Sequence, residues 1–175
     1  RAATDTRGPT AKPPLHQLKN EKDSVMFHAV FERQARRSFQ LVNQHDYDSI
    51  LASATPDIHH RFSGDHALAG ERHDAAHLRV WFERLHRLMP DLTLTVTDVW
   101  VVGGLRRTTV IVRWKAAATL LDGLRYDNHG VHVIKLRNRK VISIEVDEDS
   151  QAVARGLERQ ARSGLTEALA APIAS

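Results

Sequence analysis

The chain contains no cysteine among its 175 residues. It can therefore form no disulfide, use no thiolate nucleophile and bind no metal ion through sulfur. No apolar run approaches the roughly 20 residues that a membrane-spanning helix needs, and no glycine-rich phosphate loop or nucleophile elbow is present. We expect a cytoplasmic protein with no membrane partner, although the start at Arg1 rather than Met leaves a removed leader or tag open.

The composition is that of an ordinary soluble domain, with 42% hydrophobic and 26% charged residues. The net charge of +4 invites a nucleic-acid interpretation. However, the basic residues are spread among 21 acidic ones, and their densest run, Lys135 to Lys140, falls at a hairpin turn. No basic stripe is interleaved with aromatic residues, so we expect a solvated surface and no nucleic-acid partner.

The N-terminal segment differs from the rest of the chain. Residues 1–22 contain three of the six prolines and show no periodicity, which predicts a flexible arm. A single domain is expected over residues 23–171. Asp23 or Ser24 can cap a helix that runs to about Asn43. Its apolar stripe consists of Phe27, Phe31, Ala35, Phe39 and Val42.

The middle of the chain predicts two more helices and a short strand. A short helix opens at His45–Asp48 and ends near Ala54, and Ile58 to Phe62 follows as a strand. After a glycine-containing loop over 63–71, a helix begins near His73-Asp74 and ends at Pro90. Helical spacing places its apolar residues on one face: Leu78, Trp81, Phe82, Leu85, Leu88 and Met89.

From Leu92 onward the apolar pattern has a period of two, which is typical of strands. Two long strands over 92–102 and 107–120 are joined around Gly103-Gly104. Turns at Asp122-Gly123 and Asn138-Arg139 lead into a third and a fourth strand, and a helix is expected over 150–171. Helices followed by a run of strands predict an α+β fold. A curved antiparallel sheet wrapped around helices would enclose a cone with a pocket at its open end.

Three passages resemble a known superfamily. They are HDYDSILASATPDIHHRF at 45–62, DAAHLRVWFERLHRLMPDLTLTV at 74–96 and GVHVIKLRNRKVISIEVDEDS at 130–150. Over about residues 25–155 the chain resembles the nuclear transport factor 2-like superfamily, in its branch of SnoaL-like polyketide cyclases and ketosteroid isomerases. The resemblance implies a cone-shaped, cystatin-like α+β fold. It leaves function open, because this fold hosts isomerases, dehydratases, cyclases, hydrolases and pure binding modules.

The isomerase branch needs a carboxylate base and two acidic hydrogen-bond donors facing it. An alignment without gaps puts the base position on Phe62, the tyrosine donor on Ser38 and the protonated aspartate on His132. None of the three residue types is retained. The resemblance therefore implies that this chain does not run the isomerase reaction with the isomerase residues.

SnoaL-like cyclases carry an acid/base aspartate on the last strand, and the matching position here is about Val146, next to Asp147. The register of the last hairpin decides which side chain faces the pocket. A tight two-residue turn would set His132 opposite Glu145, with Asp147 on the same face. A one-residue bulge would set His132 opposite Ile144, with Val146 nearby. We favour the bulge, because it turns an apolar strip toward the helices.

His60 and His132 form the leading candidate pair for catalysis. A neutral imidazole in an apolar pocket can donate and accept protons near working pH, so we predict a base and an orienting acid. His60 shares a strand face with Phe62. His66 follows in a loop where active-site residues often gather, although turn chemistry at Gly64-Asp65 also explains this sequence. Each histidine could instead be a hydrogen-bonded part of the sheet.

Further residues could contact a substrate. Tyr126 and Asn128 share the face of His132 and could orient an oxygen of a ligand. Trp81, Trp100 and Trp114 could line an aromatic pocket, although their spacing is also typical of core residues. On the favoured register, Ile144 and Val146 complete the predicted substrate-binding set.

A metal site must be considered because the chain has 11 histidines. His73 and His77 lie four residues apart on a predicted helix, the spacing that brings two imidazoles to one ion. No third ligand is evident, and adjacent or strand-spaced histidines elsewhere point to opposite faces. We therefore predict no metal site.

These observations favour a cofactor-free, SnoaL-like small-molecule enzyme: a cyclase, isomerase or dehydratase-type lyase acting on an apolar, polyketide-like or steroid-like molecule. The alternative is a non-catalytic ligand-binding or dimerisation module of the same fold, which the missing isomerase residues favour. An open cavity bordered by His132 would favour the enzyme, and a filled cone the module. We also expect a homodimer through the sheet, since Val131 and Val133 would otherwise be exposed.

Overall fold

The structure, a computed structural model, describes residues 15–104 and 106–175, and the side chains of the first helix from Met26 onward. The helices of this part are α1 (Leu15–Asn43), α2 (Tyr47–Ala52), α3 (Ala75–Leu88), α4 (Ser150–Arg162) and a 3-10 helix (Thr166–Leu169). Its strands are β1 (Ala54–Phe62), β2 (Gly70–Arg72), β3 (Thr93–Gly104), β4 (Arg107–Thr119), β5 (Arg125–Arg137) and β6 (Lys140–Glu148).

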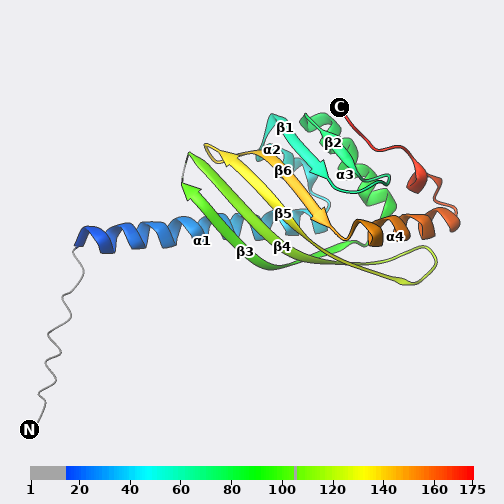
Figure 1. Cartoon of the computed structure of the whole chain (residues 1–175), viewed down its shortest axis with the longest axis horizontal. Coiled ribbons are helices and arrows are strands. Elements are labelled where there is room, and N and C mark those ends of the chain that lie inside the picture. Colours follow the sequence, from blue (N-terminus) through cyan, green and yellow to red (C-terminus); the bar gives the residue numbers. More distant parts are fainter. Residues whose placement is uncertain (1–14, 105) are drawn as a thin grey trace, which may run out of the picture.

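The six strands form one curved sheet in the order β2-β1-β6-β5-β4-β3. Strands β3 to β6 form the predicted meander of antiparallel hairpins. The helices lie against one face of this sheet, as Figure 1 shows. The predicted α+β cone is confirmed. One detail is corrected: the sheet is mixed, because β1 lies parallel to β6. A long connection that contains α3 separates these strands, and such a connection permits parallel pairing.

Helix α1 begins at Leu15, earlier than the predicted cap at Asp23 or Ser24. The sequence explains the difference, because residues 15–43 contain no proline or glycine to interrupt a helix. The predicted flexible arm is thus helical from Leu15, and the rest of it, residues 1–14, lies outside the described residues. The N-terminal part of α1 extends beyond the edge of the sheet (Figure 1).

Other elements also differ from the prediction. Strand β1 begins at Ala54, four residues before the predicted start at Ile58. Strand β2 overlaps the end of the loop predicted over 63–71, and it was not predicted because three residues are too few to show a strand period. Helix α4 ends at Arg162 instead of continuing to 171. Gly164 has a φ of 101°, a left-handed conformation that ends helices, and the chain then forms the 3-10 helix.

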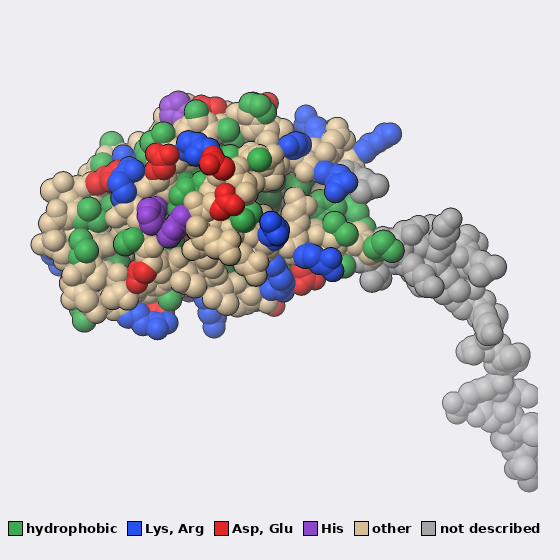
Figure 2. Space-filling model, turned by 180° about the vertical axis from the view of Figure 1, so that it is seen from behind, with side chains coloured by type: hydrophobic (Ala, Val, Ile, Leu, Met, Phe, Trp, Pro, Cys, Tyr) green, Lys and Arg blue, Asp and Glu red, His purple; other side chains and the backbone are tan. Residues whose placement is uncertain are grey.

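The hydrophobic core lies between the sheet and its helices. The apolar stripe of α1 contributes Phe31, Ala35 and Phe39, all buried. Helix α3 contributes its predicted stripe, of which Leu78 and Leu88 are fully buried. The helices of the described part are too short or too polar to cross a membrane. On the face shown in Figure 2, acidic and basic side chains are interspersed.

The β5–β6 hairpin combines the two geometries that the sequence left open. Asn138 and Arg139 have φ values of 49° and 67°, as expected of a tight two-residue turn. A register shift follows, because Lys135 pairs with Ser143 while Leu136 pairs with Val141. The extra residue of this bulge lies in β6, past the turn.

The bulge sets which side chains of β6 face the helices. His132 lies opposite Val146, so the prediction that it faces Ile144 is wrong, because the bulge shifts the strands in the opposite direction. Ile144 still lies on the same face, opposite Ile134. Since side chains alternate, Glu145 is on the outer face, as the favoured register requires.

Candidate functional site

A cavity lies between the inner face of the sheet and helices α1 and α3. The space open to the centre of a water molecule is about 100 Å³, whereas one buried water needs roughly 10–15 Å³. The walls are mainly apolar and include Phe39, Phe62, Leu68, Trp81, Phe82, Leu85 and Trp114. A second space of about 60 Å³ shares Ser38, Ile50, Ile134 and Ile144 with the first. Together they favour a ligand that is largely apolar.

Most of the residues predicted from the sequence border this cavity. They are His60, His132, Ser38, Phe62, Trp81, Tyr126 and Ile144. They come from α1, β1, α3, β5 and β6, so the fold brings together positions that are far apart in the chain.

Three predicted residues do not line the cavity. Val146 is fully buried in the sheet opposite His132. His66 lies in the loop after β1, where its ring meets the edge of the Phe62 ring at a centroid distance of 5.9 Å. Asn128 lies behind the cavity wall, and its Nδ2 donates to Oη of Tyr126 at 2.9 Å.

The state of His132 follows from its neighbour on β4. Nε1 of Trp114 donates a hydrogen bond to Nδ1 of His132 at 2.7 Å. An indole N–H can only donate, so Nδ1 must accept and the proton of a neutral ring must be on Nε2. Burial lowers the pKa of His132 to about 3. At neutral pH, His132 is therefore an uncharged hydrogen-bond donor at the cavity wall.

His60 is held differently, although it borders the same cavity. Its ring meets the edge of Trp81 at a centroid distance of 4.7 Å, and its Nδ1 is buried with no hydrogen-bond partner among the described residues. Burial, followed by the charge of Arg72, holds the pKa of His60 well below its usual value. His60 is thus neutral and a weak base at neutral pH.

Arg72 is a fully buried cation behind this wall. It donates hydrogen bonds to the backbone oxygens of Ala69 and Ile173, both at 3.0 Å. Its guanidinium lies 5.5 Å from the centre of the Trp81 ring, within the range of a cation–π contact. Burial lowers the pKa of Arg72 to about 10, which still leaves it charged at neutral pH. Arg72 therefore supports the position of Trp81.

Glu148 is the one carboxyl group that lines the cavity among the described residues. It lies opposite Gly130, two residues beyond Val146 and on the same face as His132. Burial, with a smaller contribution from Asp149, raises the pKa of Glu148 to about 8. Its Oε1 is buried without a hydrogen-bond partner in the described part of the chain.

The other oxygen of Glu148 is tied into a small polar cluster. Asn128 Nδ2 donates to Glu148 Oε2 at 3.3 Å and to Tyr126 Oη at 2.9 Å. Burial is the main cause that raises the pKa of Tyr126, so its hydroxyl keeps its proton. Tyr126 and Glu148 thus present polar atoms to one cavity, with Asn128 as their common partner.

Sequence reasoning missed Glu148 because it compared only Glu145, Val146 and Asp147 as the groups of the last strand that could face the pocket. Counting in twos from Val146 reaches Glu148, so the alternation of a strand could have found it once the register was known. The sequence left Trp114 open between pocket lining and core, and the structure places it at the cavity. Its hydrogen bond to His132 could not be predicted from spacing.

Two alternatives weighed from the sequence are corrected. Trp100 is neither core nor cavity wall, because it lies on the outer face of β3 and is 44% exposed. His73 and His77 do not form a helical pair, since α3 begins only at Ala75. Nδ1 of His77 instead lies 2.7 Å from a carboxylate oxygen of Asp74.

A curved sheet wrapped on helices around an apolar cavity defines an α+β cone of the nuclear transport factor 2-like kind. A family model described as a SnoaL-like domain matches residues 35–144, more than half of the chain. The chain therefore belongs to the SnoaL-like domain family. A comparison with curated proteins found no match.

Solved structures share this fold at low sequence identity. PrhC from Penicillium brasilianum aligns with a TM-score of 0.66 and 15% identity, over 77% of this chain and 90% of that one. TerC, co-crystallised with polyporic acid, aligns with a TM-score of 0.59 and 19% identity, over 69% and 92% of the two chains. A putative SnoaL-like polyketide cyclase from Jannaschia sp. CCS1 aligns with a TM-score of 0.59 and 18% identity, over 74% of this chain and 92% of that one. These similarities establish the fold alone.

Proposed function

We propose that this protein binds a small, largely apolar carbonyl compound and catalyses proton transfer on it without a cofactor. The observation that carries the proposal is the joint placement of two groups in one cavity. His132 is a neutral donor fixed by Trp114, and Glu148 is a carboxyl group whose pKa is raised to about 8. Membership of the SnoaL-like family supports a small-molecule role.

The proposed chemistry begins at a carbon next to the carbonyl group of the ligand. Ionised Glu148 takes a proton from this carbon, and the C–H electron pair becomes part of an enolate. The Nε2–H of His132 donates to the enolate oxygen and stabilises its charge. Protonated Glu148 then returns the proton, either to another atom or after a bond has formed or broken. An isomerase, cyclase or lyase differs only in this second step.

A base of this kind needs a pKa near the working pH. With a pKa of about 8, Glu148 has a substantial ionised fraction near pH 8 and is a far stronger base than an exposed carboxylate. His60, predicted as the base from the sequence, has a pKa well below its usual value and is less suited. We therefore assign the base to Glu148, and to His60 a second polar contact with the ligand.

Ligand binding can be tested before any reaction is known. A thermal-shift screen against steroids, aromatic polyketides, terpenoids and small hydroxy-ketones would compare the wild type with His132→Gln and Glu148→Gln. A ligand at 100 times its Kd adds about 2.7 kcal/mol to the free energy of unfolding. His129→Gln is the matched control, because His129 is exposed and lies on the opposite face of β5. We expect at least one compound to raise the Tm of the wild type and of the control by more than it raises the Tm of the two cavity variants.

The rival function is a non-catalytic module that assembles through its sheet. It draws support from exposed apolar residues on the outer face of β3, where Trp100 and Val102 are 44% and 59% exposed. A homodimer through this face is compatible with either function. Sedimentation of the wild type and of Val102→Glu would detect it, with a loss of the dimer expected in the variant. If no compound in the screen binds, the result would favour the non-catalytic module.

A further inference from the structure

Three side chains that can bind a metal ion gather on the outer face of β1 and β2. They are His59, Glu71 and His73. The strands pair with His60 opposite Arg72, and these two side chains are buried on the inner side. Because side chains alternate along a strand, the flanking residues point to the outer face, away from the cavity. The cluster is therefore separate from the proposed active site.

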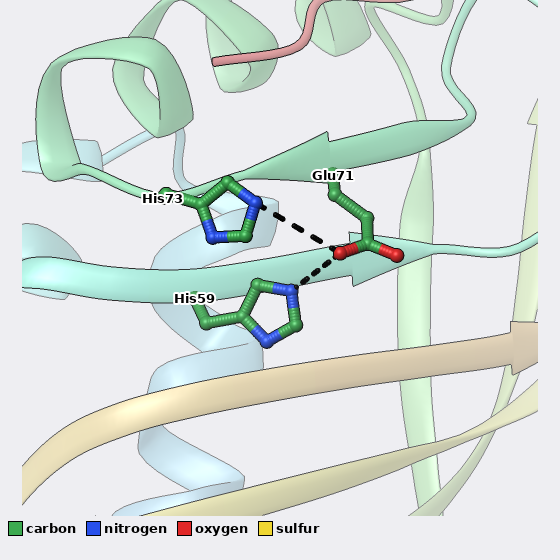
Figure 3. Close-up of side chains that lie close together, drawn as sticks. All are labelled: His59, Glu71 and His73. Atoms are coloured by element: carbon green, nitrogen blue, oxygen red, sulfur yellow. Dashed lines mark hydrogen bonds and ion pairs between the residues drawn. The ribbon is translucent and has the colours of Figure 1, made fainter.

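The three ligand atoms all lie within 4.8 Å of one another, so a small movement can bring them to one ion. Nε2 of His59 lies 2.9 Å from Oε2 of Glu71, and Nε2 of His73 lies 3.9 Å from the same oxygen. Figure 3 shows both imidazoles turned toward this carboxylate. A tetrahedral ion with bonds of about 2.0–2.1 Å separates its ligand atoms by about 3.3 Å. The observed distances lie on either side of this value.

Only a small adjustment would bring the three ligands to one point. The rings of His59 and His73 are stacked, with 3° between their planes and 4.8 Å between their centres. An imidazole nitrogen binds a metal ion in the plane of its ring. Two parallel, stacked rings therefore cannot both bind the same ion, and one of them must turn. His73 can do so because its side chain is 56% exposed.

Arg61 is a cation near Glu71, but its hydrogen bonds go elsewhere. The hydrogen bond from His59 and, to a smaller extent, the charge of Arg61 lower the pKa of the Glu71 carboxyl. Arg61 lies opposite Glu71 in the strand register. Its guanidinium instead donates hydrogen bonds to Asp147 at 3.1 Å and to Ser63 at 3.2 Å. Oε2 of Glu71 is hydrogen-bonded to Nε2 of His59 at 2.9 Å, and a bound metal ion would replace this bond with two metal–ligand bonds.

We propose that His59, Glu71 and His73 form a surface site for a late first-row divalent cation, represented by Zn²⁺. Two imidazoles and one carboxylate suit Zn²⁺, Co²⁺, Ni²⁺ or Cu²⁺, whereas Mg²⁺ and Ca²⁺ prefer oxygen ligands. Water would complete the coordination sphere. This site replaces the sequence-based expectation of no metal. The sequence did not reveal it because its ligands come from β1, from β2 and from the residue that follows β2, and β2 was predicted as a loop.

The ion would cross-link β1 to β2 and the residue after it, at the edge of the sheet. Strand β2 has three residues and pairs with β1 alone. The same two strands carry His60 and Arg72 on their inner side. A bound ion would therefore stabilise the β1–β2 edge behind the cavity wall and raise the Tm of the protein.

The test uses the full chain, freed of metal with EDTA and titrated with Co²⁺ and then with Zn²⁺. We expect one Co²⁺ per chain with visible d–d absorption, displacement by Zn²⁺ and a higher Tm with Zn²⁺. His59→Gln, Glu71→Gln and His73→Gln should each weaken Zn²⁺ binding by on the order of tenfold or more, since even groups that only orient a ligand contribute that much. They should also abolish the rise in Tm.

Two exposed histidines outside the cluster provide matched controls. His77→Gln and His129→Gln remove the same chemical group and should leave Zn²⁺ affinity unchanged. All cluster variants change exposed or half-exposed side chains, so an unaltered Tm in EDTA verifies their fold. Absence of stoichiometric binding, or equal losses in cluster and control variants, would overturn the proposal. Binding of Mg²⁺ in preference to Zn²⁺ would also overturn it.

Discussion

Nε1 of Trp114 donates to Nδ1 of His132 at 2.7 Å, and both rings border the same cavity. This one hydrogen bond fixes which nitrogen of the imidazole carries the proton. The ring of His132 is also held edge-on by Phe39, at a centroid distance of 5.0 Å. The side chain is thus oriented by its surroundings as well as neutralised by them.

Removal of the indole donor of Trp114 should allow His132 to adopt both neutral tautomers. In Trp114→Phe, Nδ1 of His132 loses its partner, and a buried polar atom without a partner costs about 1–3 kcal/mol of stability. Nitrogen NMR of the imidazole should show the Nε2–H form in the wild type and a mixture in the variant. A variant that retains a pure Nε2–H form would show that Trp114 does not set the tautomer.

The raised pKa of Glu148 predicts how stability depends on pH. Its ordinary value is 4.5 and its value in the fold is about 8. Between these values the folded protein binds more protons at this site than the unfolded chain. The contribution of Glu148 to the free energy of unfolding is therefore fully present below pH 4.5 and lost as the pH rises to about 8.

Urea unfolding at several pH values measures this dependence. Relative to Glu148→Gln, the wild type should lose stability as the pH rises through this window, by a few kcal/mol as an order of magnitude. Above about pH 8 the difference should become constant. Parallel curves for the two proteins across the whole range would show that Glu148 titrates as an ordinary carboxyl group.

The lowered pKa of His132 predicts the opposite change in the free energy of unfolding, at lower pH. Its pKa falls from 6.5 to about 3, so the unfolded chain binds more protons in this window. The contribution of His132 to stability should be complete above pH 6.5 and lost as the pH falls toward 3. His132→Gln, whose side-chain oxygen can still accept from Trp114, should lose less stability on acidification. Urea unfolding between these pH values would detect the difference, and an equal loss in both proteins would contradict the assignment.

Gly130 should tolerate no side chain, because it makes room for Trp114 and Glu148. A Cβ atom at Gly130 would lie 2.6 Å from Cζ2 of Trp114 and 2.9 Å from Cβ of Glu148. Gly130→Ala should therefore cost about 1–3 kcal/mol, as overpacking of a core does. Gly104→Ala is the matched control, because nothing lies within 4 Å of a Cβ there. Thermal unfolding should give a lower Tm for Gly130→Ala than for Gly104→Ala. Equal Tm values would contradict the close packing described around Gly130.

Elements with a strong period could be predicted from the sequence. Helix α3 follows from the spacing of Leu78, Trp81 and Leu85, and its N-cap at Asp74 follows from residue type. Strands β3 to β6 follow from alternation over nine or more residues. The three residues of β2 carry no such signal.

The polar groups of the site were harder to predict, because their roles depend on tertiary neighbours. His60 and His132 were found as candidates by their strand faces. Glu148 was missed because the comparison stopped at Asp147, although Glu148 shares the strand face of Val146. The tautomer of His132 depends on a residue 18 positions away, and no local pattern records such a contact.

Exchange of carbon-bound protons for deuterium tests the central claim most directly. A ketone that stabilises the protein in the thermal-shift screen would be followed by proton NMR in D₂O near pH 8. Because a positioned general base contributes about 10²- to 10⁴-fold, Glu148→Gln should slow the catalysed exchange by a factor in this range. His132→Gln should slow it as well, and His129→Gln should not. Equal exchange by the wild type and Glu148→Gln would contradict proton transfer by Glu148 in this cavity.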